Sequence, residues 1–192
     1  MKQFIILGGV IVGLAIYFMM TVFILPDQYL SHKIIEPQPI QSATISADTI
    51  KLGESFEIQI NVENKNDLAD ILITSVAFPE LQEIKGIVKI IAYDYTQSPR
   101  YVKLGDKINS GYTEGGQITA KYPSIEAYSR NVPENTSYQM EISVTPQNVG
   151  IFDTHIKTIA IPHKDDLSHY PNEGLLDYQD EFVTVFSVIV NP

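Results

Sequence analysis

The sequence of 192 residues contains no cysteine and no tryptophan. Without cysteine the chain forms no disulfide, no thiolate zinc site and no cysteine nucleophile, which fits a prokaryotic cell surface that does not depend on disulfides. Basic residues are also scarce, because 13 Lys and Arg stand against 23 Asp and Glu and the formal net charge is −10. Phosphate binding requires a basic surface, so we expect no nucleic-acid partner.

Sequence motifs of catalysis are missing as well. The sequence has no GxSxG, GxxxxGK[ST] or GxGxxG motif. These glycine frames present a nucleophilic serine, surround phosphates or bind dinucleotides. Pairs of acidic residues occur in any acidic chain, so their spacing does not identify a glycosidase. The sequence therefore predicts a protein that is not an enzyme and holds no organic cofactor.

A long apolar run stands near the N-terminus. Residues 4–25 are 22 residues without a charge, and a helix of that length reaches roughly 33 Å, enough to cross a hydrocarbon core of about 30 Å. Pro26 and Asp27 end the run, because proline cannot continue a helix and the charge belongs in water. We therefore expect a transmembrane anchor in residues 1–26, with the membrane as the partner of residues 4–25.

A cleaved signal peptide is the alternative to an anchor. Its apolar region has about 7–15 residues and precedes small residues at a cleavage site. Here the run is longer and LPDQYLS follows it, so an uncleaved anchor is favoured. Only Lys2 precedes the helix, which keeps the short N-terminus inside. We expect a single-pass protein of the cell membrane with an extracytoplasmic C-terminal domain.

Gly9 and Gly13 form a GxxxG pattern within the apolar run. Small residues at this spacing let a second helix approach closely, so the pattern predicts a helix-packing site. The alternative is that the two residues only reflect the frequency of glycine in membrane helices.

The rest of the chain follows the period of β-strands. Residues 27–42 contain Pro37 and Pro39 and are predicted to form an extended linker. From residue 43 to 192 apolar and polar residues alternate in several short segments, of which Phe56–Val62 is the clearest. Alternation places apolar side chains on one face of a strand and polar side chains on the other.

Six further strands are expected, separated by turn-forming residues. They cover residues 44–46, 69–78, 87–93, 138–144, 151–161 and 181–190. The last is apolar on both faces, which is typical of a strand that is central in its sheet or covered on both sides. Many short strands with turns between them predict an all-β, antiparallel sandwich.

The stretch IKLGESFEIQINVEN, residues 50–64, resembles the opening of immunoglobulin-like, CARDB-type extracellular modules, in which a Gly-Glu turn precedes an alternating strand that ends in Asn. The resemblance covers residues 43–78 and again 138–161. It implies an Ig-like sandwich with a role in adhesion or spacing at the cell surface. The 150 residues of the domain exceed the roughly 100 of a plain immunoglobulin-like domain, and the excess lies in two insertions near 94–136 and 162–180.

The first insertion is rich in tyrosine. Tyrosine combines a large apolar ring with a polar tip and is enriched in protein interfaces. We expect partner contact there, and the alternative is that the rings cover the rim of the sandwich. The candidate interface residues are Tyr95, Tyr101, Tyr112, Tyr122 and Tyr128.

The second insertion suggests a metal site. Histidine and carboxylate side chains that converge on one point bind transition metals, and carboxylates bind calcium. However, the HExxH and D-x-[DN]-x-[DN]-G frames are absent, so a solvated acidic loop is the alternative. The candidate ligands are His163, Asp165, Asp166 and His169.

Asn135 opens the triplet Asn-Thr-Ser on a polar turn, which is a glycosylation acceptor sequence in a domain that faces outward. Such triplets also occur by chance.

Together these features predict a non-catalytic, membrane-anchored interaction or structural module. Its expected role is that of an accessory subunit that contacts other membrane or envelope proteins. One alternative is a cell-surface adhesion or surface-layer-linking protein. Another is a metal-binding module that uses the His, Asp and Glu residues of segment 155–181.

Overall fold

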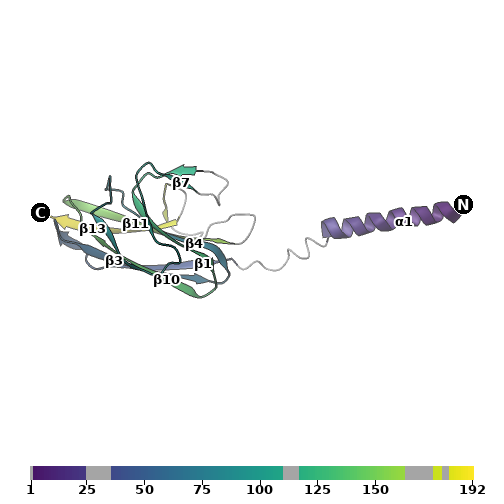
Figure 1. Ribbon diagram of the computed structural model, residues 1–192, viewed down its shortest axis with the longest axis horizontal. Helices are drawn as coiled ribbons and strands as arrows, with labels where there is room; N and C mark the ends of the chain where they lie inside the picture. The colour runs from purple at the N-terminus through teal and green to yellow at the C-terminus, as the bar shows by residue number, and fades with distance from the viewer. Residues whose placement is uncertain (1, 25–35, 110–116, 163–174, 179–181) are drawn as a thin grey trace. The chain divides into compact units, whose positions relative to one another are not determined.

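The computed structural model of the chain describes residues 2–24, 36–109, 117–162, 175–178 and 182–192. The chain divides into two compact units, Met1–Ile35 and Glu36–Pro192. Figure 1 shows that the described residues of the first unit are helical and that the second unit, here called the head, is built from strands. The head confirms the predicted all-β sandwich.

The N-terminal unit is a helix, α1 (Lys2–Met19), that continues directly into a π-helical segment, η1 (Met20–Ile24). The Thr21 hydroxyl donates a hydrogen bond of 2.9 Å to the carbonyl of Tyr17, so this polar group is satisfied within the helix. Within the described residues, no helix has both the length and the apolar character needed to cross a membrane. The structure therefore does not support the transmembrane helix expected over residues 4–25, which stays a prediction from the sequence.

The head consists of two main sheets. Sheet A has four antiparallel strands in the order β1-β3-β10-β5. Its strands are β1 (Gln38–Ile45), β3 (Phe56–Lys65), β10 (Thr136–Val144) and β5 (Val88–Tyr93).

Sheet B has seven strands, six of them in the order β12-β13-β11-β4-β9-β6, while β2 pairs with β13 in parallel. They are β12 (Leu175–Leu176), β13 (Phe182–Asn191), β11 (Gly150–Pro162), β4 (Ala69–Ala77), β9 (Ser124–Val132), β6 (Arg100–Val102) and β2 (Thr49–Lys51). A separate hairpin joins β7 (Lys107–Asn109) and β8 (Gln117–Thr119).

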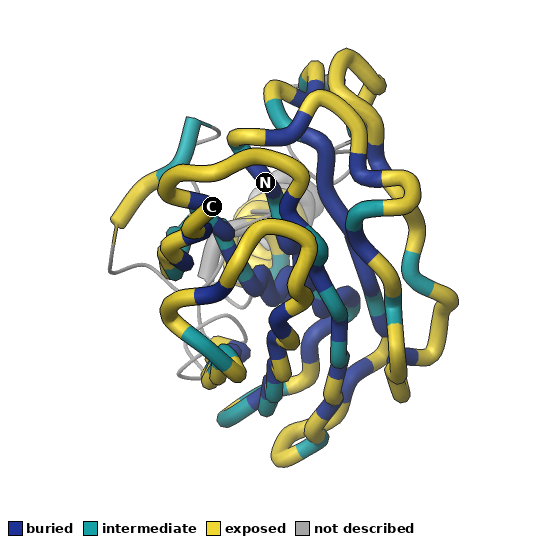
Figure 2. Tube along the Cα trace, turned by 90° about the vertical axis from the view of Figure 1, so that its left-hand side faces the viewer, coloured by how far each residue is buried: buried dark blue, intermediate teal, exposed yellow. Residues whose placement is uncertain are grey.

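The core lies between the two sheets. The predicted alternation of β3 is confirmed, because Phe56, Ile58, Ile60 and Val62 are fully buried while the residues between them face outward. In Figure 2 the buried residues run along the middle of the strands and the exposed residues gather at the turns. The ring of Phe152 on β11 lies 5.9 Å from that of Phe56, so aromatic contact joins the two sheets.

The Gly-Glu turn that carries the CARDB-type resemblance has a local structural role. Gly53 has a φ of +86°, a left-handed conformation that glycine adopts without steric cost. Glu54 then folds back, and its carboxylate accepts a hydrogen bond of 2.9 Å from the backbone N–H of Lys51. The turn thereby connects β2 in sheet B to β3 in sheet A.

The asparagine at the other end of the resembling stretch ties the sheets together. Asn64 is fully buried, and its Nδ2 donates to the carbonyls of Asp67, Val132 and Pro133 at 2.8, 3.0 and 3.3 Å. Val132 ends β9 of sheet B, whereas Asn64 lies on β3 of sheet A. One amide group therefore stabilises the turn after β3 and joins the two layers.

The first strand begins earlier than predicted. β1 starts at Gln38, so residues 38–42 belong to the head and not to the linker expected at 27–42. Pro39 is tolerated because β1 is an edge strand that pairs only with β3, where a missing N–H can be accommodated without interrupting a central ladder.

The expected insertion at 94–136 contains a strand of the sandwich itself. β9 lies between β4 and β6 and pairs with β4 along its whole length. The inner row of β9 includes Ala127 and Ser129, which are too small or too polar to give a clear period-two signal. The sequence pattern therefore missed β9, whose position in the sheet is defined by its pairing with β4 and β6.

The last strand is central in its sheet, as predicted, because β13 lies between β11 on one side and β2 and β12 on the other. Full coverage of both faces is not observed: Val185 and Ile189 are exposed. The strands with a second buried apolar face are β4 and β11, whose residues Ile71, Ile159 and Ile161 form a separate cluster.

Candidate functional site

The outer face of sheet B carries a group of charged and aromatic residues, here called the fastened face: Arg100, Tyr122, Glu126, His155, Lys157, Asp177 and Tyr178. The inner positions Ile156 and Thr158 of β11 are buried, so His155 and Lys157 point outward. Residues of both predicted insertions, among them Tyr122 and Tyr178, meet over these strand residues.

A buried ion pair holds the segment around β12 to sheet B. Lys157 Nζ lies 2.9 Å from Asp177 Oδ2, and the two side chains are only 11% and 8% exposed. A pair in this environment is screened little by water, but each charge depends on the other to offset its desolvation. The pair therefore indicates a structural fastening of residues 175–178 to sheet B.

Aromatic contacts strengthen the same fastening. The Tyr178 ring packs edge-on against Tyr122, with centroids 5.4 Å apart, and the Lys121 ammonium lies 4.8 Å from the Tyr178 centroid. The Tyr178 hydroxyl accepts a hydrogen bond of 3.1 Å from the backbone N–H of Lys121. Burial raises the pKa of Tyr178 and outweighs the opposing effect of this hydrogen bond. Tyr178 is therefore a neutral packing residue at ordinary pH.

The remaining charged pair lies on the neighbouring strands β9 and β6. The Arg100 guanidinium donates to Glu126 Oε2 from two nitrogens, at 2.7 and 3.1 Å. The cleft among these groups has a volume of 20 Å³, which holds about one water molecule. Paired charges around so small a space are suited to joining segments.

One predicted interface tyrosine lies in the core. Tyr95 is buried and stacks on Tyr138 with centroids 5.1 Å apart. Its hydroxyl donates a hydrogen bond of 2.7 Å to the Thr74 hydroxyl, and burial raises its pKa strongly. The expected partner contact is therefore wrong for Tyr95, because its ring fills the space between the sheets.

Of the other four predicted tyrosines, three lie in the part of the chain that the structure describes. Tyr101 is exposed, Tyr122 belongs to the fastened face and Tyr128 is half-buried on β9. Tyr112 lies outside the described residues. Contact of these residues with a partner stays a prediction.

The candidate metal ligands His163, Asp165, Asp166 and His169 all lie outside the described residues. In the part of the chain that the structure does describe, no group of three or more His, Asp or Glu residues is placed to hold a metal ion. A metal site in the second insertion therefore stays a prediction.

Asn135 and Gly13 both occupy open positions. Asn135 is exposed on the turn between β9 and β10, with a φ of +58°, and its Oδ1 accepts a hydrogen bond of 3.3 Å from Lys65. At Gly13 a Cβ would meet no atom within 4 Å, and Gly9 lies one turn earlier in α1. Glycosylation at Asn135 and helix packing at Gly9 and Gly13 stay predictions.

Two isoleucines on the outer face of sheet B are exposed, and sequence patterns did not single them out. Ile151 of β11 and Ile189 of β13 are directly opposite each other in the register, and they are 68% and 50% exposed. This isoleucine pair was hidden in strands that are apolar on both faces. Only the pairing of β11 with β13 shows that both side chains share one open surface.

A pocket of 680 Å³, here called the corner pocket, opens between the chain before β5 and the chain around β6. Both strands are edge strands of their sheets. Its lining consists of Gln82, Glu83, Ile84, Lys85, Gly86, Tyr101, Lys103, Leu104 and Pro123.

Solved structures similar to the chain include two of the CARDB domain of PF1109 from Pyrococcus furiosus. Its crystal structure in complex with di-metal ions is 10% identical, with 80% of this chain and 94% of that chain covered and a TM-score of 0.39. Its solution NMR structure is 11% identical, with 81% and 98% covered and a TM-score of 0.36. The CARDB-type resemblance stated from the sequence is therefore also found among solved structures, as a likeness of fold.

A third similar structure is AvmM, described as catalysing macrocyclization in alchivemycin A biosynthesis. It is 10% identical, with 82% of this chain and 90% of that chain covered and a TM-score of 0.42. No protein-family model and no curated protein sequence matches the chain.

Proposed function

We propose that the protein is a non-catalytic interaction module whose head is tethered to a membrane and contacts another membrane or envelope protein. The observation that carries the proposal is the isoleucine pair, because Ile151 and Ile189 are large apolar side chains left in water on an ordered sheet. The charged groups of the fastened face support a role without chemistry, since they are paired with one another.

The exposed isoleucines differ from the outward-facing residues of β3 in sheet A. These are Glu57, Gln59 and Asn61, which are suited to water. Complete burial of an isoleucine contributes about 1.5–3 kcal/mol, so covering the half-exposed pair contributes on the order of 2 kcal/mol. That is the size of a typical hot spot in a protein interface.

The tether is supported by the apolar run of residues 4–25 and by the surface of α1. The large apolar side chains between Val10 and Met19 are 54–67% exposed. A continuous apolar surface of this kind requires a lipid or protein environment. The absence of charge along the run favours lipid, and the short N-terminus with Lys2 favours an extracytoplasmic head.

Extraction of membranes from the native host tests the tether. The full chain should stay in the membrane pellet after alkaline carbonate treatment. Ile11→Lys places a charge near the middle of the run, which costs about 3 kcal/mol of insertion, so the variant should shift toward the supernatant. Ile11→Leu is the matched control and should stay in the pellet. Release of the unaltered chain by carbonate would show that no helix anchors it.

Site-specific photo-crosslinking in intact cells tests the contact surface. A photoreactive residue at Ile151 should form a defined crosslinked species, whereas one at Gln59 on sheet A should not. Ile189→Asp should abolish the species while the thermal unfolding of the head is unchanged, since residue 189 faces water. Equal crosslinking from both positions would rule out the isoleucine pair as the contact. Mass spectrometry of the species separates a multi-spanning subunit from surface-layer material.

A further inference from the structure

The corner pocket has the size and the rigidity of a ligand site. Its volume of 680 Å³ falls within the range of about 300–1,000 Å³ that is typical of small-molecule pockets. Ile84 forms a buried part of the wall, and its carbonyl accepts hydrogen bonds from the backbone N–H groups of Ile87 and Val88, at 3.1 and 2.9 Å. These bonds fix the segment that enters β5, so this wall is already formed without a ligand.

The opposite wall is positioned by sheet B. Tyr101 lies on β6 and is paired with Ile125 of β9. Leu104 follows on the next turn, where the backbone N–H of Lys103 donates a hydrogen bond of 2.8 Å to Asp106 Oδ2. Tyr101 and Leu104 are each about half exposed and thus present apolar surface that a ligand can cover.

The charge around the pocket is opposite to that of the whole chain. Among the described residues that line it, Lys85 and Lys103 stand beside a single acid, Glu83, so this lining has a net charge of +1 whereas the chain has −10. Neither lysine takes part in an ion pair within the described ranges, where the ion pairs are Lys65–Glu63, Arg100–Glu126 and Lys157–Asp177. An anionic group would therefore find ammonium groups that are available for charge-assisted hydrogen bonds.

The adjoining edge strands disfavour an extended peptide as the occupant. β6 has only three residues. β5 carries Lys89 and an irregularity in its register opposite Glu141 and Ile142, which leaves Ile91 without a partner on β10. Lysine and bulges are features by which edge strands avoid pairing with another chain. A compact ligand fits this corner better than an added strand.

We infer that the corner pocket binds a small organic acid with an apolar body. The body would cover Ile84, Tyr101 and Leu104, and the carboxylate would pair with Lys85 or Lys103. The site lies apart from the isoleucine pair, whose residues do not line the pocket. The inference is therefore independent of the proposed contact with a partner protein.

Ligand-observed NMR with the full chain in lipid nanodiscs tests the assignment, with 4-phenylbutyrate as the probe and 4-phenylbutanol and 4-phenylbutylamine as uncharged and cationic analogues. The acid should bind, the alcohol about tenfold more weakly and the amine more weakly still, because only the acid pairs with ammonium groups. Binding of the amine as tight as that of the acid would overturn the inference.

Two lysine variants locate the site. The double variant Lys85→Met, Lys103→Met should weaken binding of 4-phenylbutyrate about tenfold or more, while Lys51→Met, at an exposed position on β2, should leave it unchanged. All three lysines are exposed, so the variants should fold. Unchanged affinity in the double variant would overturn the inference, as would tighter binding of an acetylated peptide that ends in phenylalanine, which would indicate a protein C-terminus as the ligand.

Discussion

The outer faces of the two sheets that form the sandwich differ in what they carry. The outer face of sheet A carries polar residues of β3 and β10, such as Gln59 and Glu141, that are exposed or half-buried. The outer face of sheet B carries the buried apolar residues Ile71, Ile159 and Ile161 and the fastened face beside them. A sheet face is thus open or covered according to which other segments fold over it.

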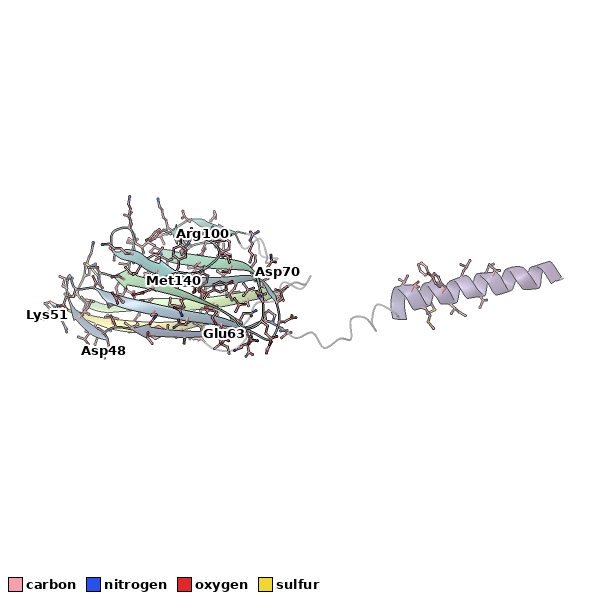
Figure 3. The ribbon with its side chains drawn as sticks, turned by 60° about the horizontal axis from the view of Figure 1, so that its bottom comes forward. Asp48, Lys51, Glu63, Asp70, Arg100 and Met140 are labelled. Carbon is pink, nitrogen blue, oxygen red and sulfur yellow. The ribbon has the colours of Figure 1, made fainter. Side chains whose placement is uncertain are left out.

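The same contrast is seen in the ion pairs of the two faces. Lys65 and Glu63 on sheet A form a pair in which each side chain is about one-third exposed, whereas Lys157 and Asp177 on sheet B are nearly buried. Figure 3 shows where the exposed pair lies: Glu63 is at the same end of the head as Asp70, and Lys51 and Asp48 are at the opposite end. Exposed pairs contribute little to stability, but a buried charge that loses its partner is costly. The buried pair on sheet B, and not the exposed pair on sheet A, therefore holds a further segment, residues 175–178, in place.

The largest expected effect tests the inner and outer rows of sheet A. Ile60→Asp places an uncompensated charge at a fully buried position and should lower the free energy of unfolding by about 4 kcal/mol or more, which leaves the head unfolded at 25 °C or close to it. Gln59→Asp on the exposed row should change it by less than about 0.5 kcal/mol. Circular dichroism during urea unfolding measures both. Equal tolerance of the two substitutions would contradict the phase of β3.

The second prediction compares the two ion pairs. Asp177→Asn removes the carboxylate that pairs with the Lys157 ammonium at a nearly buried position, so the free energy of unfolding should fall by about 3 kcal/mol. Glu63→Gln at the exposed pair should cost no more than about 0.5 kcal/mol. Urea unfolding gives both values, and similar losses would show that the fastened face is not protected from water.

The third prediction concerns the residue that joins the two sheets. Asn64→Ala removes the donor for three carbonyl groups and should cost about 2 kcal/mol. Gln139→Ala, at an exposed position of the neighbouring strand β10, is the control and should cost less than about 0.5 kcal/mol. In the Asn64→Ala variant, hydrogen exchange should show that backbone amides lose protection mainly at the β3–β4 and β9–β10 turns. Protection lost evenly over the head would argue against a local junction.

The smallest effect depends on pH. Burial raises the pKa of Tyr95 above its ordinary value of 10.0, so the folded state holds the proton more tightly than the unfolded state. The free energy of unfolding should therefore be unaffected by this group below pH 10 and should fall as the pH rises above it. Tyr95→Phe should make the decline between pH 10 and 11 shallower, and Tyr101→Phe is the exposed control. Identical slopes in the two variants would contradict a buried hydroxyl.

Local sequence patterns predicted the strands of the head that have one buried face and one face exposed to solvent. The alternation in β3 and β10 and the turn at Gly53 follow from the backbone period and from turn chemistry. The pattern missed β9, whose inward-facing side chains are small, and placed the start of β1 too late, because a proline is permitted in this edge strand. Both errors arise because a strand is also defined by its neighbours.

The candidate sites were less accessible to sequence reasoning than the strands. Lys157 and Asp177 are separated by 20 positions, and neither is part of a motif, but the pairing of β11, β13 and β12 in sheet B brings them together. The isoleucine pair and the corner pocket each join segments far apart in the chain. The isoleucine pair depends on the register of β11 and β13, and the corner pocket depends on the edge strands β5 and β6 lying close together.

The sequence alone determined the acidic character of the chain, the absence of disulfides and a head of alternating strands, because composition and period two are local properties. Only the tertiary structure decided that Tyr95 fills the core, that the outer face of sheet B is partly covered and that Ile151 and Ile189 are left in water. The physical reason is that burial is a property of pairs of segments. Which side chains meet is settled only when the two sheets are packed together and the residues around Tyr122 and Tyr178 lie against one of them.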